Sequence, residues 1–168
     1  MSSKEDTTIR FSGLKPGVYN YGFTLADEFF EAWENDEIEG GNVKIDVKME
    51  RRDQLLLLEF TLRGEVEVLC DRCLGRLTVP IEGREHLTVS FSDTATTDDE
   101  EQAILPEDAS KIDLAQWLYE YVAVRIPLLH AHPDGECDPE TVKYLSDNTR
   151  QRPDDEIDPR WDALKKLK

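Results

Sequence analysis

The chain has 168 residues and a formal net charge of −17, with 39% hydrophobic and 34% charged residues. This length is enough for one domain with its own hydrophobic core. The acidic balance argues against a protein that coats nucleic acid or anionic membranes through bulk electrostatics. No apolar run approaches the roughly 20 residues that cross a bilayer, and residues 1–6 lack the apolar core of a signal peptide. We therefore expect a cytoplasmic protein without a membrane partner, whose cysteines are metal ligands or free thiols.

The negative charge is concentrated in the two flanks of the chain. Residues 41–92 carry eight lysines and arginines against nine acidic residues, so this middle region is close to neutral. The flanks hold the remaining charge of −16. The middle region suits local contact with RNA, and the acidic flanks suit a basic protein partner.

The first 40 residues predict a hairpin followed by a short helix. Apolar residues alternate weakly over residues 7–23 and are interrupted by the turn signal Lys15-Pro16-Gly17. Over residues 25–34, aliphatic and aromatic residues recur at helical spacing. This pattern predicts an amphipathic helix with Trp33 in the core.

Residues 42–92 predict five short strands. Apolar residues alternate with charged ones over residues 43–50, as in a half-buried strand. Further apolar runs occupy 55–62, 66–68, 77–81 and 87–91, separated by a turn at 51–54, Gly64, a cysteine turn and Gly83. The tight connections favour an antiparallel meander, either a curved sheet or a partly closed barrel.

The rest of the chain predicts one main helix between acidic segments. Residues 92–109 are expected to form an acidic loop. Ser110 and Asp113 resemble a capping box at the start of a helix over residues 111–126, whose apolar face, with Trp117, packs on the sheet. Residues 138–158 are again acidic, and residues 161–167 predict a short terminal helix. The predicted fold is thus α+β, with one domain over residues 1–137 and a tail over residues 138–168.

Two cysteines three positions apart, Cys70 and Cys73, form the strongest motif. The third cysteine, Cys137, lies far downstream, shortly after His130 and His132. Zinc in structural sites prefers four thiolate or imidazole ligands, and a compact turn presents the first pair. We therefore predict a structural zinc site built from the three cysteines and one of the two histidines.

Other interpretations of the cysteines stay open. They can be inert buried thiols or a redox pair, although no βαβ pattern surrounds them. If metal binds, Gly75 is expected to let the turn fold back toward it. The sequence lacks a His-Glu-x-x-His helix, a phosphate loop and a catalytic triad. We expect a non-enzymatic protein, and a zinc-dependent hydrolase is the remaining enzyme hypothesis.

Several arginines are candidates for contact with nucleic acid or with a partner. They are Arg63, Arg72, Arg76 and Arg84, with Arg52 as a further member of the same predicted face. Arginines on an antiparallel sheet are more often its solvated face, and no RNA-recognition consensus with interleaved aromatic residues is present. Protein binding is therefore the first hypothesis and RNA contact the second.

Taken together, the motifs resemble the YceD family of bacterial and plastid large-subunit ribosomal RNA accumulation proteins. The matching features are Cys70-Asp71-Arg72-Cys73-Leu74 after a meander, an acidic loop, the helix from Ile112 to Arg125, Ile126-Pro127 followed by His132 and Cys137, and Asp158-Pro159-Arg160-Trp161 with Leu164 and Leu167. The resemblance covers the chain from about residue 40 to its end. By position it favours His132 over His130 as the fourth member of the zinc site.

The resemblance implies a role in the accumulation of large-subunit (23S) ribosomal RNA, and hence in ribosome biogenesis, without an established enzymatic activity. Members are often encoded beside a small zinc-ribbon protein of the large ribosomal subunit. Structural zinc is our own inference. We expect the acidic segments to steer a basic ribosomal or assembly protein onto a rigid face formed by the meander and the cysteine turn. Direct binding of ribosomal RNA is the alternative.

Overall fold

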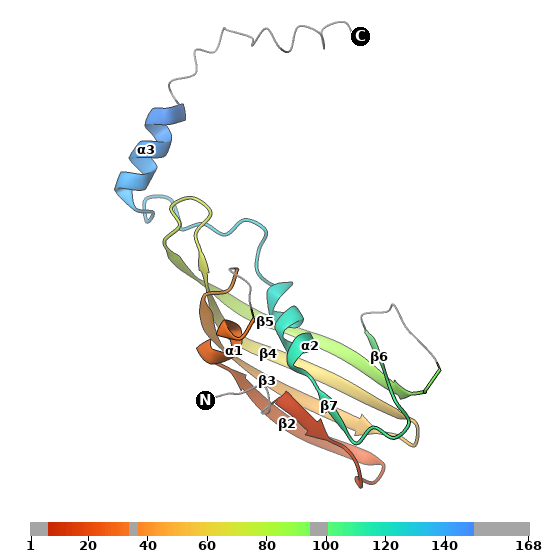
Figure 1. Ribbon diagram of the computed structural model, residues 1–168. Coiled ribbons are helices and arrows are strands. Elements are labelled where there is room, and N and C mark those ends of the chain that lie inside the picture. The colour runs from red at the N-terminus through yellow and green to blue at the C-terminus, as the bar shows by residue number, and fades with distance from the viewer. Residues whose placement is uncertain (1–6, 34–36, 95–100, 150–168) are drawn as a thin grey trace, which may run out of the picture.

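A long twisted sheet with helices on one face forms the body of the protein (Figure 1). The computed structural model describes residues 7–33, 37–94 and 101–149. The described elements, in chain order, are β1 (Thr8–Arg10), β2 (Gly17–Leu25), α1 (Asp27–Glu31), β3 (Gly40–Arg51), β4 (Leu55–Leu69), β5 (Arg76–Phe91), β6 (Gln102–Leu105), β7 (Lys111–Asp113), α2 (Ala115–Ala123) and α3 (Pro139–Thr149). None of the described helices is both long enough and apolar enough to cross a membrane.

The main sheet has the strand order β2-β3-β4-β5-β6. Its first four strands form an antiparallel meander, and β6 lies parallel to β5 at one edge. Alternate residues of the long strands, including Ile45, Phe60 and Leu87, are buried on the face that α1 and α2 cover. The predicted α+β fold with an antiparallel meander is confirmed. The sheet is open, so the partly closed barrel is wrong.

Three long strands occupy residues 40–91, where the sequence predicts five short ones. The predicted breaks are wrong because β4 continues through Gly64 and β5 continues through Gly83. A Cβ atom on Gly64 would lie 2.2 Å from the backbone oxygen of Asn42, and one on Gly83 would lie 1.9 Å from Nε of Arg125. Both glycines therefore allow another group to approach the strand closely, and neither ends it.

The predicted hairpin over residues 7–23 is also wrong, because its two strands have other partners. β2 pairs with β3, while β1 pairs with β7 across a hundred residues of sequence. Ile9 and Ile112 stand opposite one another in this small sheet, and both are buried. The hydroxyl of Thr7 donates to Asp113 at 3.0 Å. These long-range contacts outweigh the local turn signal at residues 15–17.

The two predicted helices on the sheet occur, but both are shorter than expected. α1 buries Phe29 and Phe30, and α2 buries Leu118 and Val122. Residues 111–113 form β7 instead of the first helical turn, so the predicted capping box is wrong.

The N-cap residue of α2 is Leu114, whose side chain makes no capping hydrogen bond. The carboxylate of Asp113 accepts the backbone N–H of Ala115 at 3.0 Å. Both predicted core tryptophans are partly buried against the core, and Trp33 stacks on Tyr119 with ring centroids 4.5 Å apart. This stacking links the residues just after α1 to α2.

Two elements lie in segments for which the sequence predicts none. β6 lies within the expected acidic loop, and its Ala103 is buried beside β5. α3 lies within the expected acidic tail, and the carboxylate of Asp138 accepts the backbone N–H of Thr141 at 2.8 Å at its start. The terminal helix predicted over residues 161–167 lies outside the described residues.

Candidate metal centre

The six residues between β4 and β5, residues 70–75, form a tight turn that we call the cysteine knuckle. The N–H of Cys70 donates to the carbonyl of Gly75 at 2.8 Å, and the N–H of Leu74 donates back to the carbonyl of Cys70 at 2.9 Å. Leu74 takes the left-handed conformation with φ +57°. Gly75 does not have a positive φ, and a Cβ atom on it would lie 3.4 Å from the sulfur of Cys73. Cys70 is buried, and Cys73 is partly exposed.

The segment from residue 124 to residue 138, here called the connecting loop, runs from α2 to α3 and crosses the knuckle (Figure 1). Two backbone contacts fix it there. The N–H of Asp71 donates to the carbonyl of His130 at 2.9 Å, and the N–H of His130 donates to the Asp71 carboxylate at 2.7 Å. The ring of His130 contacts the carbonyl of Pro127 at 2.9 Å and the Asp71 carboxylate at 3.5 Å. His130 therefore anchors the loop, and both of its ring nitrogens are engaged.

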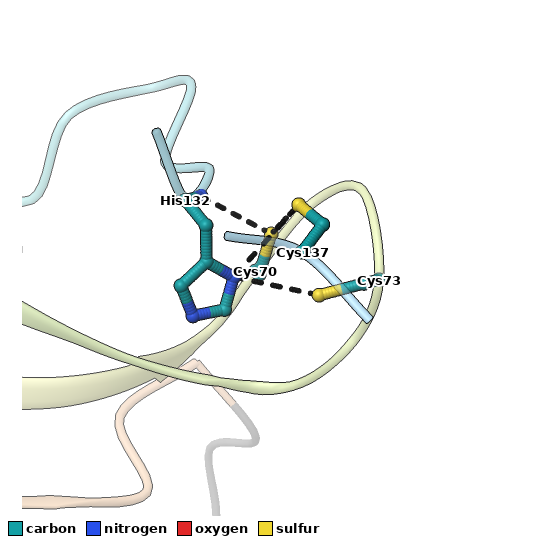
Figure 2. Close-up of side chains that lie close together, drawn as sticks. All are labelled: Cys70, Cys73, His132 and Cys137. Carbon is teal, nitrogen blue, oxygen red and sulfur yellow. Dashed lines mark hydrogen bonds between the residues drawn. The ribbon is translucent and has the colours of Figure 1, made fainter. Parts of the chain in front are cut away.

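Figure 2 shows Cys70 and Cys73 of the knuckle facing His132 and Cys137 of the connecting loop. One ligand atom from each of these residues lies within 4.8 Å of the other three. The sulfur of Cys70 lies 3.9 Å from that of Cys137, and Nδ1 of His132 lies 3.4 Å from the sulfur of Cys73 and 3.9 Å from that of Cys137. The structure thus brings together the four residues that the sequence analysis selected.

These distances suit a tetrahedral zinc ion. Zinc binds thiolate sulfur at about 2.3 Å and imidazole nitrogen at about 2.0–2.1 Å, so its tetrahedral ligand atoms are about 3.5–3.8 Å apart. The three distances above, 3.4–3.9 Å, lie close to this spacing. Three thiols and one imidazole also form a common donor set for structural zinc.

The imidazole of His132 is held in the tautomer that metal binding requires. Its Nε2 lies 2.9 Å from the backbone carbonyl of Arg76. Because a carbonyl oxygen can only accept, the proton is on Nε2 and the Nδ1 lone pair of the neutral ring faces the thiols. The same hydrogen bond is the largest cause of the raised pKa of His132, followed by its contact with Cys73.

The protein stabilises thiolate at the knuckle. Burial alone raises the pKa of Cys70, but backbone N–H groups directed at its sulfur, from His132 and Arg72 at 3.4 Å each, help to lower it to about 5. Backbone hydrogen bonds from Asp138 and Gly75 lower the pKa of Cys73.

The pKa of the third thiol, that of Cys137, is shifted in the opposite direction. Burial, followed by the neighbouring Cys70 and Cys73, raises the pKa of Cys137 to about 11. A metal that binds all three sulfurs must therefore displace a proton from Cys137 at neutral pH.

The candidate arginines do not form a single basic face. Arg63, Arg76 and Arg84 lie on the outward side of β4 and β5, interleaved with acidic residues, and Arg76 pairs with Glu67 at 3.1 Å. Arg72 lies on the knuckle and pairs with Asp134 of the connecting loop at 3.2 Å.

Arg52 lies apart from the others. It lies just after β3, where it pairs with Glu50 at 2.8 Å. The predicted set is therefore distributed over the sheet, the knuckle and the turn that follows β3.

Sequence reasoning missed the residues that support the site. Asp71 holds the connecting loop, and the backbone of Arg76 orients His132. An aspartate between the two cysteines was a usable signal, because a carboxylate in a turn commonly accepts backbone N–H groups. A backbone carbonyl leaves no signal in the sequence.

One comparison with known proteins gives a match. A family model described as "Large ribosomal RNA subunit accumulation protein YceD" matches residues 58–168, which include the knuckle, α2, the connecting loop and α3. Neither a search of curated proteins nor a search of solved structures gave a match. The family's description ties it to accumulation of the large ribosomal RNA. Since the family model covers more than half of the chain and all four residues of the metal centre, this chain belongs to the YceD family of large ribosomal RNA subunit accumulation proteins.

Proposed function

We propose that this protein is a non-enzymatic ribosome biogenesis factor that supports accumulation of 23S ribosomal RNA by binding a basic ribosomal or assembly protein, with zinc as a structural cofactor. The observation that carries the proposal is the cluster of three thiols and one imidazole that joins the knuckle to the connecting loop. Membership of the YceD family supplies the link to ribosomal RNA.

The donor set supports a structural role for the metal. Cys70, Cys73, His132 and Cys137 would fill all four tetrahedral positions, whereas a catalytic zinc ion keeps one position for water. Bound zinc would hold the connecting loop against the knuckle. A hydrolase would also need a general base, and the nearby carboxylates of Asp71 and Asp134 already bond to His130 and Arg72. These contacts support a protein without enzymatic activity.

Exposed apolar side chains near the metal centre support a protein partner. Leu74 on the knuckle is 71% exposed, and Leu128 and Leu129 on the connecting loop are 99% and 85% exposed. Burial of exposed apolar side chains against a partner lowers the free energy of the complex. Apolar side chains are also typical of the core of a protein interface. The left-handed backbone of Leu74 costs about 1–2 kcal/mol relative to its usual conformation. That cost is understandable if the leucine side chain contacts a partner.

The overall charge points to a basic partner. A net charge of −17 accelerates association with a cationic protein and opposes association with RNA phosphates. Lysines and arginines do occur on the outward face of the sheet, but acidic residues are interleaved with them, as in the ion pair between Lys48 and Glu59 at 3.0 Å. Direct RNA binding is therefore the second candidate.

Binding assays over a range of salt concentrations separate the two candidates. We expect basic large-subunit ribosomal proteins to bind the purified protein and RNA alone to show no binding. Leu128→Asp with Leu129→Asp should weaken protein binding, while Arg63→Ala with Arg84→Ala serves as the matched control on the outward face. RNA binding with a steep salt dependence that Arg63→Ala with Arg84→Ala reduces would favour the RNA-contacting factor instead.

A further inference from the structure

The strand β2 forms one edge of the main sheet. In the strand order of the described sheets, β2 lies beside β3, and no further strand lies beyond it (Figure 1). It is nine residues long, from Gly17 to Leu25. The outer side of an edge strand carries backbone N–H and C=O groups that can pair with a strand from another chain. β2 therefore offers a long template for such pairing.

β2 lacks the features by which proteins usually protect an exposed edge. Charged residues, proline and short length are the common ones. The nine residues of β2 include no charged residue and no proline, although 34% of the whole chain is charged. The opposite edge is protected, because β6 has only four residues and Pro106 follows it directly. This contrast indicates that the β2 edge is a site of strand pairing.

Aromatic side chains line the core-facing side of this edge and stay partly exposed. Tyr19, Tyr21 and Phe23 pack against the core, and Tyr21 stands opposite the buried Val47 of β3. An added strand would bring its own side chains beside these three. Aromatic residues opposite one another on neighbouring strands stabilise the pair by about 0.2–1 kcal/mol. The most favourable neighbour is therefore a strand that also carries aromatic residues at alternate positions.

A second copy of β2 has this pattern. In an antiparallel pair of identical strands centred on Tyr21, that residue stands opposite its own counterpart, and Tyr19 stands opposite Phe23. The whole strand is paired in this register, because its first and last residues are equally far from Tyr21 along the chain. Residues directly opposite share a face, so both cores lie on the same side of one continuous sheet. A two-fold axis at the centre makes the contact identical for both copies.

The charges beyond the two ends of β2 are complementary in this register. Residue 15 of one copy is level with residue 27 of the other, so Lys15 comes close to Asp27 and Glu28 at the start of α1. All three residues are exposed. The hydroxyl of Tyr19 donates to the carbonyl of Lys15 at 2.9 Å and holds this turn against the strand. The contact between opposite charges occurs twice, once at each end of the paired strands.

Like charges are well separated in the same arrangement. The acidic first turns of the two α1 helices lie at opposite ends of the pair, about 40 Å apart at about 3.3 Å per residue, which is far beyond the Debye length of about 8 Å. On the outward face of β3, Lys44 and Lys48 alternate with Asp46 and Glu50, so the surface beside β2 is balanced. A basic segment would find no excess of acid along this strand. The local charges therefore favour a second copy over a basic partner.

We propose that the β2 edge is a homodimer interface, at which two copies of this chain join their main sheets by antiparallel pairing of β2 about a two-fold axis at Tyr21. The candidate metal centre is not part of this interface, because the knuckle lies between β4 and β5. The inference goes beyond the proposed function and does not depend on it.

The mass of the full-length protein in solution gives the first test. Sedimentation equilibrium over a range of concentrations should show twice the mass of one chain at high concentration and dissociation on dilution. Edge-facing amides of β2 should exchange hydrogen quickly in the monomer and slowly in the dimer. Asn20→Lys places two lysines diagonally across the pair, about 7–8 Å apart, and should weaken the dimer about fivefold. Thr78→Lys, exposed on the outward face of β5, is the matched control and should leave the dimer unchanged.

A cross-linking experiment tests the register. Pairing centred on residue 21 places two copies of that residue opposite one another, at a Cα distance of about 4.5–5.5 Å that a disulfide can span. With oxidised glutathione, Tyr21→Cys should form a covalent dimer above the background given by the three native cysteines of the unaltered protein. Val18→Cys is the matched control. Val18 is 55% exposed, but its two copies would be about 20 Å apart, so this variant should not cross-link above background.

Charge exchange tests the contacts at the two ends. Lys15→Glu should weaken the dimer about tenfold, because it replaces attraction by repulsion at both ends of the pair. Addition of Glu28→Lys to the same chain should restore the affinity. Failure of the second substitution to restore it would contradict the register.

Three results would overturn the proposal. One is a monomer at every concentration, and another is equal yields of covalent dimer from Val18→Cys and Tyr21→Cys. The third is a different occupant of the edge. Slow exchange of the edge-facing β2 amides that persists in the diluted monomer would mean that the chain's own residues cover them. Slow exchange that appears only when a basic ribosomal protein is added would assign the edge to that protein.

Discussion

The imidazole of His132 donates from Nε2 to the backbone carbonyl of Arg76 across 2.9 Å, and this contact directs Nδ1 toward the thiols of the knuckle. The residue on the connecting loop is thus oriented by the first residue of β5. A hydrogen bond from the other ring nitrogen of a metal-binding histidine raises the basicity of the ligand nitrogen and fixes the orientation of the ring. The candidate metal centre is therefore formed by residues of the sheet as well as by residues of the connecting loop.

We predict that His132→Ala removes metal and lowers Tm, whereas His130→Ala keeps both near their original values. The reason is that His130 directs its ring nitrogens to Pro127 and Asp71, while its backbone contacts with Asp71 survive the substitution. Elemental analysis and thermal unfolding measure the two effects. In a chain of this size, each kcal/mol lost lowers Tm by about 2–4 °C. Retention of metal by His132→Ala would contradict the assignment.

Zinc affinity should fall as the pH is lowered, because the ligands must lose protons before they bind. Cys137, with its pKa raised to about 11, is protonated at neutral pH in the metal-free protein and must release that proton. Cys70, with its pKa lowered to about 5, is already a thiolate at neutral pH and competes with protons only near and below pH 5.

The slope of zinc affinity against pH should therefore become steeper as the pH falls toward about 5. His132, whose pKa is raised by its hydrogen bond to the Arg76 carbonyl, adds its own proton to this competition. Competition with a chromophoric chelator over a pH series measures the slope. An affinity that does not change with pH would contradict binding through these thiols.

Gly83→Ala should destabilise the fold by about 1–3 kcal/mol, because the added Cβ would displace the guanidinium of Arg125 from its hydrogen bonds to the Glu85 carboxylate and the Tyr121 carbonyl. The same exchange at an open, unstrained position usually stabilises by about 0.4–1 kcal/mol. Gly22→Ala on β2 is the matched control, since nothing lies within 4 Å of the added atom. Urea unfolding measures both.

A double-mutant cycle tests the cause of this effect. Arg125→Ala removes the group that crosses β5, so Gly83→Ala should be almost harmless in that background. If Gly83→Ala is equally destabilising with and without Arg125, the close approach between the two residues is not the reason.

Leu74→Gly should stabilise the knuckle by up to about 1 kcal/mol while it weakens binding of the partner. Glycine adopts φ +57° without the strain that leucine carries there. Leu74→Ala keeps the strained backbone and removes most of the apolar side chain, so it should weaken binding without the gain in stability. Partner binding that is unchanged in both variants would remove Leu74 from the proposed interface.

The sequence predicted those elements of the fold whose signal lies in neighbouring residues. The alternation over residues 43–50 predicts a half-buried strand, and β3 contains it. The helical spacing around Trp117 predicts α2, and the cysteine spacing predicts a paired-thiol turn. In each of these cases, neighbouring residues carry the signal.

The features that the sequence did not predict depend on contacts between distant parts of the chain. No local feature of residues 8–10 shows that they pair with residues 111–113. Gly83 interrupts an apolar pattern and resembles a break, but its purpose is evident only once Arg125 is placed over it. Spacing alone also left His130 and His132 as alternatives, because the choice depends on which backbone carbonyls their rings meet.

Metal analysis of the purified, untagged protein, prepared under reducing and chelator-free conditions, tests the central claim most directly. The account predicts about one zinc ion per chain, which is the capacity of a single tetrahedral site, and its loss in Cys70→Ser together with a lower Tm. Absence of zinc from the unaltered protein, with no change in Tm in Cys70→Ser, would show that the three cysteines are buried thiols and that the connecting loop is held without metal.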